Sequence, residues 1–319
     1  MAVQRVITLL LICALYVPST SLAEQNRVYI SQIIDHPALN LVKQGLVDGL
    51  IQQGYRQGDN LEIKYEIANG NPTEAAKIAR KFVTQHPDVM VGIATPTSQA
   101  LVASSRTIPI VFTAVTDPIG SRLVKRLNNP GRNVTGLSDL SPISQHMDLM
   151  KVLLPEVRQV GVLYNPGEAN SVALLERLQH VSHMKGLSIV EAEVLRSSDV
   201  KHLAQRLAHE VDVIYAMTDN TIASAISDLI SSATKEETPV FAGAVAYVEK
   251  GAIAGLGFDY YQIGLQTADY VARILTGEKP GTMPVTVAKG SDLALNDEAA
   301  KQLGVKIPQS IRDKVTKLY

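Results

Sequence analysis

The sequence predicts an α/β protein made of two doubly wound parallel-sheet lobes that are joined by a multi-strand hinge. Short apolar segments alternate with helical segments along the chain, which is typical of parallel sheets with helical crossovers. The order of these segments also occurs twice: Val28 corresponds to Val160, and Val89 corresponds to Val213. The offsets of about 130 residues have the length of a domain rather than of a solenoid repeat. Two similar lobes with polar turns facing each other predict a cleft that closes on a ligand.

The expected elements of the first lobe follow from local signals. After a strand at 28–34, Pro37 begins a helix with an apolar stripe, and Gly54 ends it. The segment 61–67 alternates as a strand, Thr73 caps a helix to about residue 85, and Pro87 stops that helix. The continuous apolar runs 89–94 and 108–114 are typical of parallel strands that are buried on both faces.

The second lobe repeats this order, and the chain then returns to the first. A turn at 128–131 precedes the segment 134–140, which leads to a new helix near Ser144 and marks the first crossing between lobes. The helix that ends at Gly277 is expected to pack on lobe one, and the tail is expected to cross back.

The predicted division is 1–23 as a signal peptide, 24–139 plus about 258–290 as lobe one, and 140–257 plus about 291–319 as lobe two. The expected elements of lobe two are strand 160–164, helix 169–185, strand 187–194, helix 199–209, strand 213–217, helix 221–235, strands 239–243 and 253–258, and, in the tail, segment 293–296 and helix 297–303.

The first residues predict a cleaved secretory signal. Arg5 precedes an apolar run at 6–17, and Ser21-Leu22-Ala23 is a cleavage signal of small residues. An uncleaved N-terminal anchor is the alternative, although the run is short for a span of about 20 apolar residues. The only cysteine, Cys13, lies inside the run, and the formal net charge is −1. We therefore expect an exported periplasmic protein without disulfides and with no electrostatic basis for binding nucleic acid.

Five ordered segments resemble one known family. They are SQIIDHPALN (31–40), the segment 113–139, VGVLYNPGEANS (160–171), TDNTIASA (218–225) and GFDYYQIGLQTA (257–268). Together they are similar to the periplasmic substrate-binding proteins of ABC importers, in the group typified by tryptophan- and tyrosine-binding members. The likeness runs from about residue 27 to 307. It implies the type I periplasmic-binding-protein fold, an amino-acid-like ligand, and delivery to a membrane permease.

The candidate ligand site follows from the topology, because ligands of open α/β sheets bind beyond the carboxyl ends of the strands. This rule selects the turns 31–38, 95–98, 114–118, 164–171, 217–221 and 243–247. Thr95, Thr97 and Ser98 open a helix after a buried strand, where N–H groups and hydroxyls favour a ligand carboxylate. Ordinary helix capping is the alternative interpretation.

Acidic residues in two of these turns are candidates for binding an ammonium group. Asp117 follows Thr116 at the end of a lobe-one strand, and Asp219 precedes Asn220 in lobe two. A carboxylate forms charge-assisted hydrogen bonds with an ammonium, but it also caps helices. We expect Asp219 to bind the ammonium, because lobe two has a carboxylate where lobe one has hydroxyls.

Other polar and aromatic residues of these turns complete the candidate set. Glu168 is expected to act as a first-turn partner of its own helix rather than as a ligand group. Tyrosines are also common in cores and hinges, so the aromatic candidates have two interpretations. The remaining candidates are Asn165, Asn170 and Ser171 in one turn, His36 in the first turn, and Tyr247, Tyr260 and Tyr261 as aromatic walls.

A monomeric ligand-binding module is the function that these features favour, without cofactor or metal. An exported hydrolase is an alternative, but the chain has no G-x-S-x-G, H-E-x-x-H or P-loop motif. The histidines do not gather at the spacing of a zinc site. A periplasmic sensor and a sugar-binding protein with the same fold remain open, since the sequence does not settle the ligand.

Overall fold

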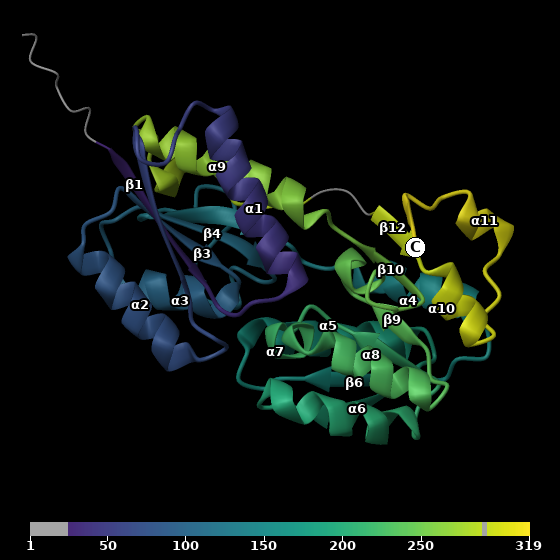
Figure 1. Ribbon diagram of the computed structural model, residues 1–319. Coiled ribbons are helices and arrows are strands. Elements are labelled where there is room, and N and C mark those ends of the chain that lie inside the picture. The colour runs from purple at the N-terminus through teal and green to yellow at the C-terminus, as the bar shows by residue number, and fades with distance from the viewer. Residues whose placement is uncertain (1–24, 289–291) are drawn as a thin grey trace, which may run out of the picture.

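The computed structural model describes residues 25–288 and 292–319, and its two β-sheets are each covered by helices (Figure 1). The predicted signal peptide lies outside the described residues. The first sheet has six strands in the order β11-β5-β4-β3-β1-β2, and all of its neighbouring strands are parallel. Its strands are β1 (Asn26–Gln32), β2 (Leu61–Ile67), β3 (Val89–Ile93), β4 (Ile110–Val115), β5 (Val134–Ser138) and β11 (Thr286–Val287).

The second sheet has seven strands in the order β13-β12-β10-β9-β8-β6-β7. One pair, β10 with β12, is antiparallel, whereas the prediction was of parallel strands throughout. Doubly wound folds often carry such an antiparallel edge. The strands are β6 (Gln159–Tyr164), β7 (Ser188–Glu193), β8 (Val213–Ala216), β9 (Val240–Ala242), β10 (Ala254–Gly257), β12 (Asp292–Leu295) and β13 (Lys317–Leu318).

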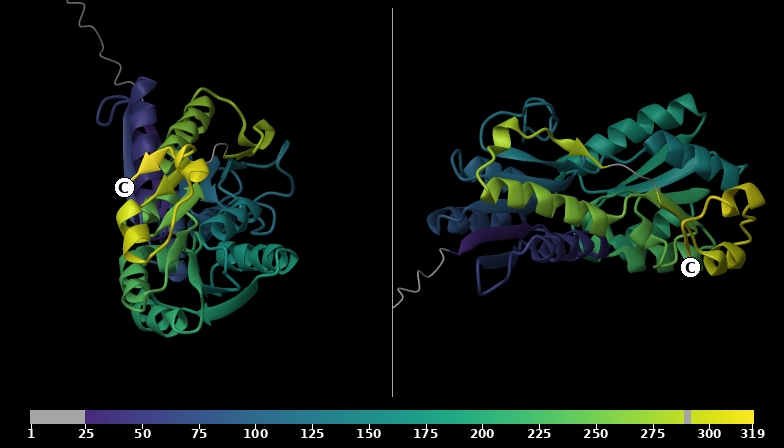
Figure 2. Two further views of the ribbon diagram at one scale, coloured as in Figure 1. Left: turned by 90° about the vertical axis from the view of Figure 1, so that its right-hand side faces the viewer. Right: turned by 90° about the horizontal axis from the view of Figure 1, so that it is seen from above.

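The helices divide between the two sheets, which we call lobe one and lobe two with the helices that cover them. Figure 2 shows the C-terminal helices with lobe two, while α9 covers lobe one. Lobe one has α1 (Pro37–Gln52), α2 (Pro72–Thr84), α3 (Thr95–Ser104) and α9 (Tyr260–Leu275). Lobe two has α4 (Ile143–Leu153), α5 (Ala169–Met184), α6 (Val200–Ala208), α7 (Asn220–Ser224), α8 (Ile226–Lys235), α10 (Asp297–Gln302) and α11 (Gln309–Arg312). None of the helices in the described ranges is long and apolar enough to cross a bilayer.

One predicted helix is two in the structure. The segment 221–235 contains α7 and α8, which are separated at Ala225 with φ −121° and ψ 27°. The break lets the short α7 point its N-terminus at the space between the lobes, while α8 packs beside α6 on the sheet. The α/β architecture with two sheets agrees with the fold class that the sequence predicts.

Helices α1 and α9 approach each other at glycines. A Cβ atom on Gly45 would lie 2.1 Å from the carbonyl oxygen of Tyr261, and one on Gly264 would lie 2.3 Å from that of Val42. Real side chains never come this close, so the helix–helix contact requires glycine at both positions. The contact matters for function because both helices begin at the space between the lobes.

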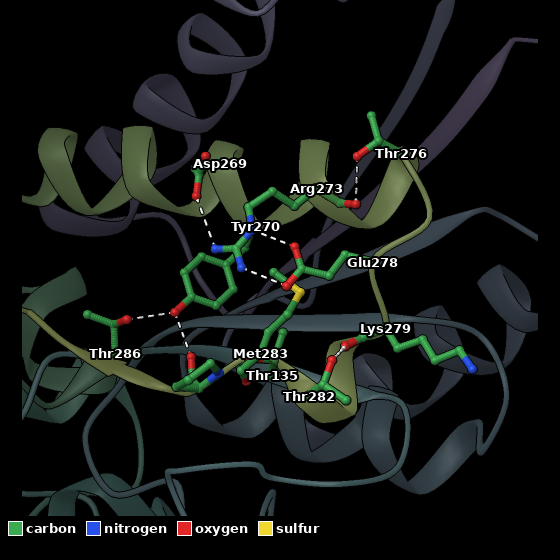
Figure 3. A network of polar contacts seen from close by, with 11 residues as sticks. Thr135, Asp269, Tyr270, Arg273, Thr276, Glu278, Lys279, Thr282, Met283 and Thr286 are labelled. Carbon is green, nitrogen blue, oxygen red and sulfur yellow. Dashed lines mark hydrogen bonds and ion pairs between the residues drawn. The ribbon is translucent and has the colours of Figure 1, made fainter.

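The segment after α9 is fixed to lobe one by polar contacts (Figure 3). The Tyr270 hydroxyl lies 2.6 Å from the Pro284 carbonyl oxygen and 2.6 Å from the Thr286 hydroxyl. The Thr135 hydroxyl of β5 donates to the Met283 carbonyl oxygen at 2.8 Å. These bonds hold β11 beside β5 and so complete the first sheet with residues distant in sequence.

Candidate functional site

A small cavity lies between the two lobes, at the carboxyl ends of their strands. Its volume is about 20 Å³, which is room for little more than one water molecule. A larger groove of about 620 Å³ lies between the loop after α4 and the loop after α10, but its lining is mostly apolar. The interlobe cavity is lined by His36, Ala38, Leu39, Ala114, Thr116, Asp139, Asn170, Thr218, Asn220, Tyr247 and Tyr260.

Lobe one contributes the start of α1 and the ends of β4 and β5. Pro37 sets the first turn of α1, and no side chain caps that turn, so its first N–H groups face the cavity unbonded by side chains. The register of β4 shifts between Phe112 and Val115, and Ala114 has φ 52° within the irregularity. Such a bulge re-aims side chains next to a binding site. It brings Ala114 to the cavity wall.

Asp139 follows β5 and is buried, with 4% of its surface exposed. Its Oδ2 accepts a hydrogen bond from the Tyr260 hydroxyl at 2.9 Å, while its Oδ1 has no partner among the described residues. Burial raises the pKa of the Asp139 carboxyl from 3.8 to about 6. Tyr260 begins α9, so the contact joins the two points at which the chain crosses between the sheets.

Two buried carboxylates occupy the lobe-two side around the start of α7. Glu168 accepts from the backbone N–H of Thr221 at 3.1 Å and from its hydroxyl at 2.8 Å, and also from the Asn220 amide side chain. Asp219 accepts from the backbone N–H of Ile222 at 2.9 Å. Burial, together with the charge of Glu168, raises the pKa of Asp219. The N-terminus of α7 is therefore already neutralised by the protein's own carboxylates.

One hydrogen bond joins the two lobes across the cavity. His36 Nε2 of lobe one lies 3.4 Å from Asn220 Oδ1 of lobe two. Burial lowers the pKa of His36 to about 4, so the imidazole is neutral at pH 7. Because this contact needs both lobes, it exists only when they lie together.

Several polar atoms without hydrogen-bond partners line the cavity. Among the described residues, eleven buried side-chain oxygen or nitrogen atoms have no hydrogen-bond partner, and four of them line this cavity. Leaving a buried polar atom unpaired costs about 1–3 kcal/mol, so a ligand that pairs with these atoms stabilises the closed form. The four atoms are His36 Nδ1, Asp139 Oδ1, Asn170 Oδ1 and Thr218 Oγ1.

Six predicted site residues line the cavity, and their contact with a ligand stays a prediction. Thr95 does not line it, although its hydroxyl is buried and unpaired. Among the described residues no group of three or more acidic, histidine or cysteine side chains is placed to hold a metal ion. The six residues are His36, Thr116, Asn170, Asn220, Tyr247 and Tyr260.

The hydroxyl turn of lobe one does not line the cavity, and its contact with a ligand carboxylate stays a prediction. The Thr97 hydroxyl donates to the Ile93 carbonyl oxygen at 2.7 Å, and the Ser98 hydroxyl donates to the Ala94 carbonyl oxygen at 2.7 Å. Hydroxyls near a helix start readily bond to the preceding backbone in this way. These hydroxyls donate to the protein's own backbone and do not line the cavity.

Neither of the predicted ammonium-binding carboxylates, Asp117 and Asp219, lines the cavity, and their contact with a ligand stays a prediction. Asp117 Oδ1 accepts from the backbone N–H of Gly120 at 2.9 Å and caps a turn. Asp219 accepts from Asn165 N at 2.7 Å and from the Ser171 hydroxyl, so all three residues support the loop behind the cavity wall. Tyr261 likewise points elsewhere, toward Asp48 at 3.1 Å. For Asp117 and Asp219 these bonds to backbone N–H groups are those of the capping alternative.

The sequence does not single out Asp139 or Thr218 as site residues. The strand-end rule applies to the turn after 134–138 as it does to the others, but the same segment also marks the crossing between lobes. Thr218 lies inside a selected turn, next to the more conspicuous carboxylate of Asp219. Glu168 proved to serve the start of α7 rather than its own helix, because its side chain makes no cap bond within α5.

Related proteins carry the same fold over nearly the whole chain. A tyrosine-binding protein from Clostridioides difficile is 33% identical over 287 residues, which cover 90% of this chain and 83% of the relative. The structure of an ABC domain from Streptococcus pneumonia in complex with L-Trp is 32% identical, with a TM-score of 0.90, and covers 93% of this chain and 100% of the other.

A ligand-free relative is less similar in structure to this chain. The ligand-free, open structure of a substrate binding protein from Clostridium difficile is also 32% identical, covering 92% of this chain and 98% of the other. Its TM-score is only 0.68, against 0.90 for the L-Trp complex. This chain therefore superposes more closely on the L-Trp complex than on the ligand-free, open structure.

The sequence also matches the model of a protein family. The model for ABC transporter substrate binding proteins matches residues 27–318, which include both sheets and every residue of the cavity lining. This chain belongs to the family of ABC transporter substrate binding proteins.

Proposed function

We propose that this protein binds an amino acid with an aromatic side chain in the interlobe cavity and delivers it to the permease of an ABC importer. The observation that carries the proposal is the gathering of four unpartnered polar atoms around one cavity, beside the rings of Tyr247 and Tyr260. Polar atoms suit the charged ends of an amino acid, and the tyrosine rings suit an apolar side chain. Relatives named for tyrosine and tryptophan support the same ligand class.

Binding is proposed to proceed by closure of the lobes. The present cavity is smaller than an amino acid, so the ligand must enter an open form, and the lining must move apart around it. Closure is stabilised only as far as the ligand binds the closed form better than the open one. The segment 1–23 is proposed to direct export to the periplasm, where a monomer would meet the permease.

Ligand-induced stabilisation tests the proposal directly. Thermal unfolding with each of the twenty amino acids and a set of common sugars is expected to show a response to tyrosine, tryptophan or phenylalanine. A ligand at about 100 times its dissociation constant stabilises the folded state by roughly 2.7 kcal/mol. A response to sugars without a response to amino acids would contradict the amino-acid assignment and favour the sugar-binding alternative.

Enlarging Ala114 is expected to block the cavity. In Ala114→Leu the longer side chain would fill space that a ligand needs, so affinity should fall by about tenfold or more, measured by isothermal titration calorimetry. Ala114→Gly is the matched control, because it adds no atoms and suits the φ of 52°. Equal affinities for the leucine and glycine variants would show that Ala114 does not limit the ligand.

A further inference from the structure

We propose that Glu168 makes the interlobe cavity a site for a primary amine, by turning the neighbouring amides so that hydrogen-bond acceptors face the ligand. The ligand's ammonium group is then recognised more strongly than its carboxylate. This inference rests on the proposed function, since it concerns how the same cavity selects its ligand. Glu168 acts as a positioning residue, because it does not itself line the cavity.

The first step is the arrangement of the amides around Glu168. The Glu168 carboxylate is buried, with 7% of its surface exposed, and it accepts from Asn170 Nδ2 at 3.3 Å and from Asn220 Nδ2. A carboxylate is an acceptor only, so both amides must turn their NH₂ groups toward it. Their oxygens consequently point away: Asn170 Oδ1 is unpartnered at the cavity, and Asn220 Oδ1 faces His36.

The second step fixes the proton on His36. Asn220 Oδ1 accepts, so His36 Nε2 at 3.4 Å must be the donor. The neutral imidazole has one proton, which leaves Nδ1 as an acceptor, and Nδ1 is buried without a partner. By orienting the Asn220 amide, Glu168 of lobe two therefore also determines which nitrogen of His36 in lobe one carries the proton.

The third step counts the groups that a ligand meets. His36 Nδ1, Asn170 Oδ1 and Asp139 Oδ1 are three unpartnered acceptors at one small cavity. An ammonium has three N–H donors and a positive charge. Among the described residues no lysine or arginine lines the cavity, and an ammonium group of the ligand would supply the positive charge that pairs with Asp139.

The ligand carboxylate has weaker partners. The start of α7 is unavailable, because Glu168 and Asp219 already accept from the N–H groups of Thr221 and Ile222. The uncapped first turn of α1, with Ala38 and Leu39 at the cavity, offers backbone donors on the lobe-one side. A zwitterion is therefore expected to place its carboxylate toward α1 and its ammonium toward Asp139 and Asn170.

The test compares probes that lack one charged group each. Calorimetry on the full chain measures L-tyrosine, tyramine, which lacks the carboxylate, and 3-(4-hydroxyphenyl)propanoate, which lacks the ammonium. Relative to L-tyrosine, we expect a loss of about tenfold for tyramine and of about 1000-fold for the propanoate, because charge-assisted bonds are the stronger ones. If L-tyrosine binds and the propanoate loses no more than tyramine, this inference is overturned. Failure of both L-tyrosine and L-tryptophan to bind would overturn the proposed function instead.

Two variants separate positioning from a merely structural role. In Glu168→Gln the new NH₂ group competes with the asparagine donors, so an asparagine amide turns its own NH₂ toward the cavity. The ratio of tyramine affinity to propanoate affinity should fall about tenfold or more. Asp35→Asn, an exposed carboxylate beside His36, controls for the change of charge and should leave the ratio within about twofold. An unchanged ratio in Glu168→Gln would overturn the role of Glu168. Should that variant fail to fold, Asp139→Asn tests the acceptor set, and an unchanged ratio there overturns the inference.

Discussion

Replacing Asp139 by asparagine is expected to weaken ligand binding by about 100-fold or more and at the same time to stabilise the ligand-free protein at pH 7. The carboxyl is buried and its Oδ1 is unpaired, so the folded protein holds a charge that the unfolded chain exposes to water. Asparagine keeps an oxygen for the Tyr260 hydroxyl and removes the charge. We expect the free energy of unfolding to rise by about 3 kcal/mol, which corresponds to the shift in pKa from 3.8 to about 6.

The pH dependence of the free energy of unfolding independently shows whether the charged Asp139 carboxylate destabilises the fold. Because the pKa of Asp139 is higher in the folded than in the unfolded protein, the folded protein binds more protons between these values. The contribution of Asp139 to stability is therefore largest below pH 4 and is lost as the pH rises through about 6. The free energy of unfolding of Asp139→Asn, measured by denaturant titration between pH 4 and 7, should lack the part of its pH dependence that Asp139 causes. A variant that is less stable than the unmodified protein at pH 7 would contradict this account of Asp139.

Binding should respond in the opposite direction to stability. The ligand's ammonium stabilises the charged carboxylate, so affinity in the unmodified protein should weaken as the pH falls below about 6. The other titratable groups that line the cavity are His36, which is neutral throughout this range, and the two tyrosines. In Asp139→Asn an NH₂ group would meet the ammonium donors, and affinity should fall by about 100-fold or more. Calorimetry at pH 5 and pH 7 measures both effects.

A valine at Gly264 is expected to have the largest effect on stability. A Cβ atom there would lie 2.3 Å from the Val42 carbonyl oxygen and 2.8 Å from Gly45 Cα, so α1 and α9 would have to separate. Overpacking against backbone, which cannot rotate away, should lower the free energy of unfolding by at least about 3 kcal/mol. Urea denaturation measures the change.

An exposed position on the same helix provides the control. Gln266→Val places the same β-branched residue on the solvent face of α9, two residues away, and should change stability by no more than about 0.5 kcal/mol. Similar results for the two variants would mean that helix propensity, and not the approach of α1, explains the effect. Gly264→Val should also weaken ligand binding, since both helices begin at the cavity with residues of its lining.

The strands could be predicted because their signals are local. Continuous apolar runs such as 89–94 form strands that are buried on both faces, and the structure has β3 there. The break at Ala225 has no such signal, since neither glycine nor proline lies near it. The antiparallel pairing of β10 with β12 depends on where the tail returns, which is a tertiary property.

The candidate site was harder to predict because capping and ligand binding use the same residues in the same turns. Asp117 and Asp219 accept from backbone N–H groups, as helix-capping carboxylates do, and a sequence cannot say which way a carboxylate points. His36, Thr116, Asn170, Asn220 and Tyr247 lie at the cavity because the strand-end rule concerns topology, which the alternation of elements reveals. Glu168 accepts hydrogen bonds at the start of α7 from residues about 50 positions away, and no local sequence pattern predicts such a contact.

The glycine contact between α1 and α9 also bears on how the chain folds. Gly45 and Gly264 are separated by most of lobe two in sequence, yet α1 covers lobe one only together with α9. During synthesis, the part of α1 that packs on α9 stays uncovered until α9, which ends at Leu275, has been made. Contacts of such long sequence separation form late and slow the acquisition of structure. Lobe one is therefore expected to mature after the central strands of lobe two, although its first strand is made earlier.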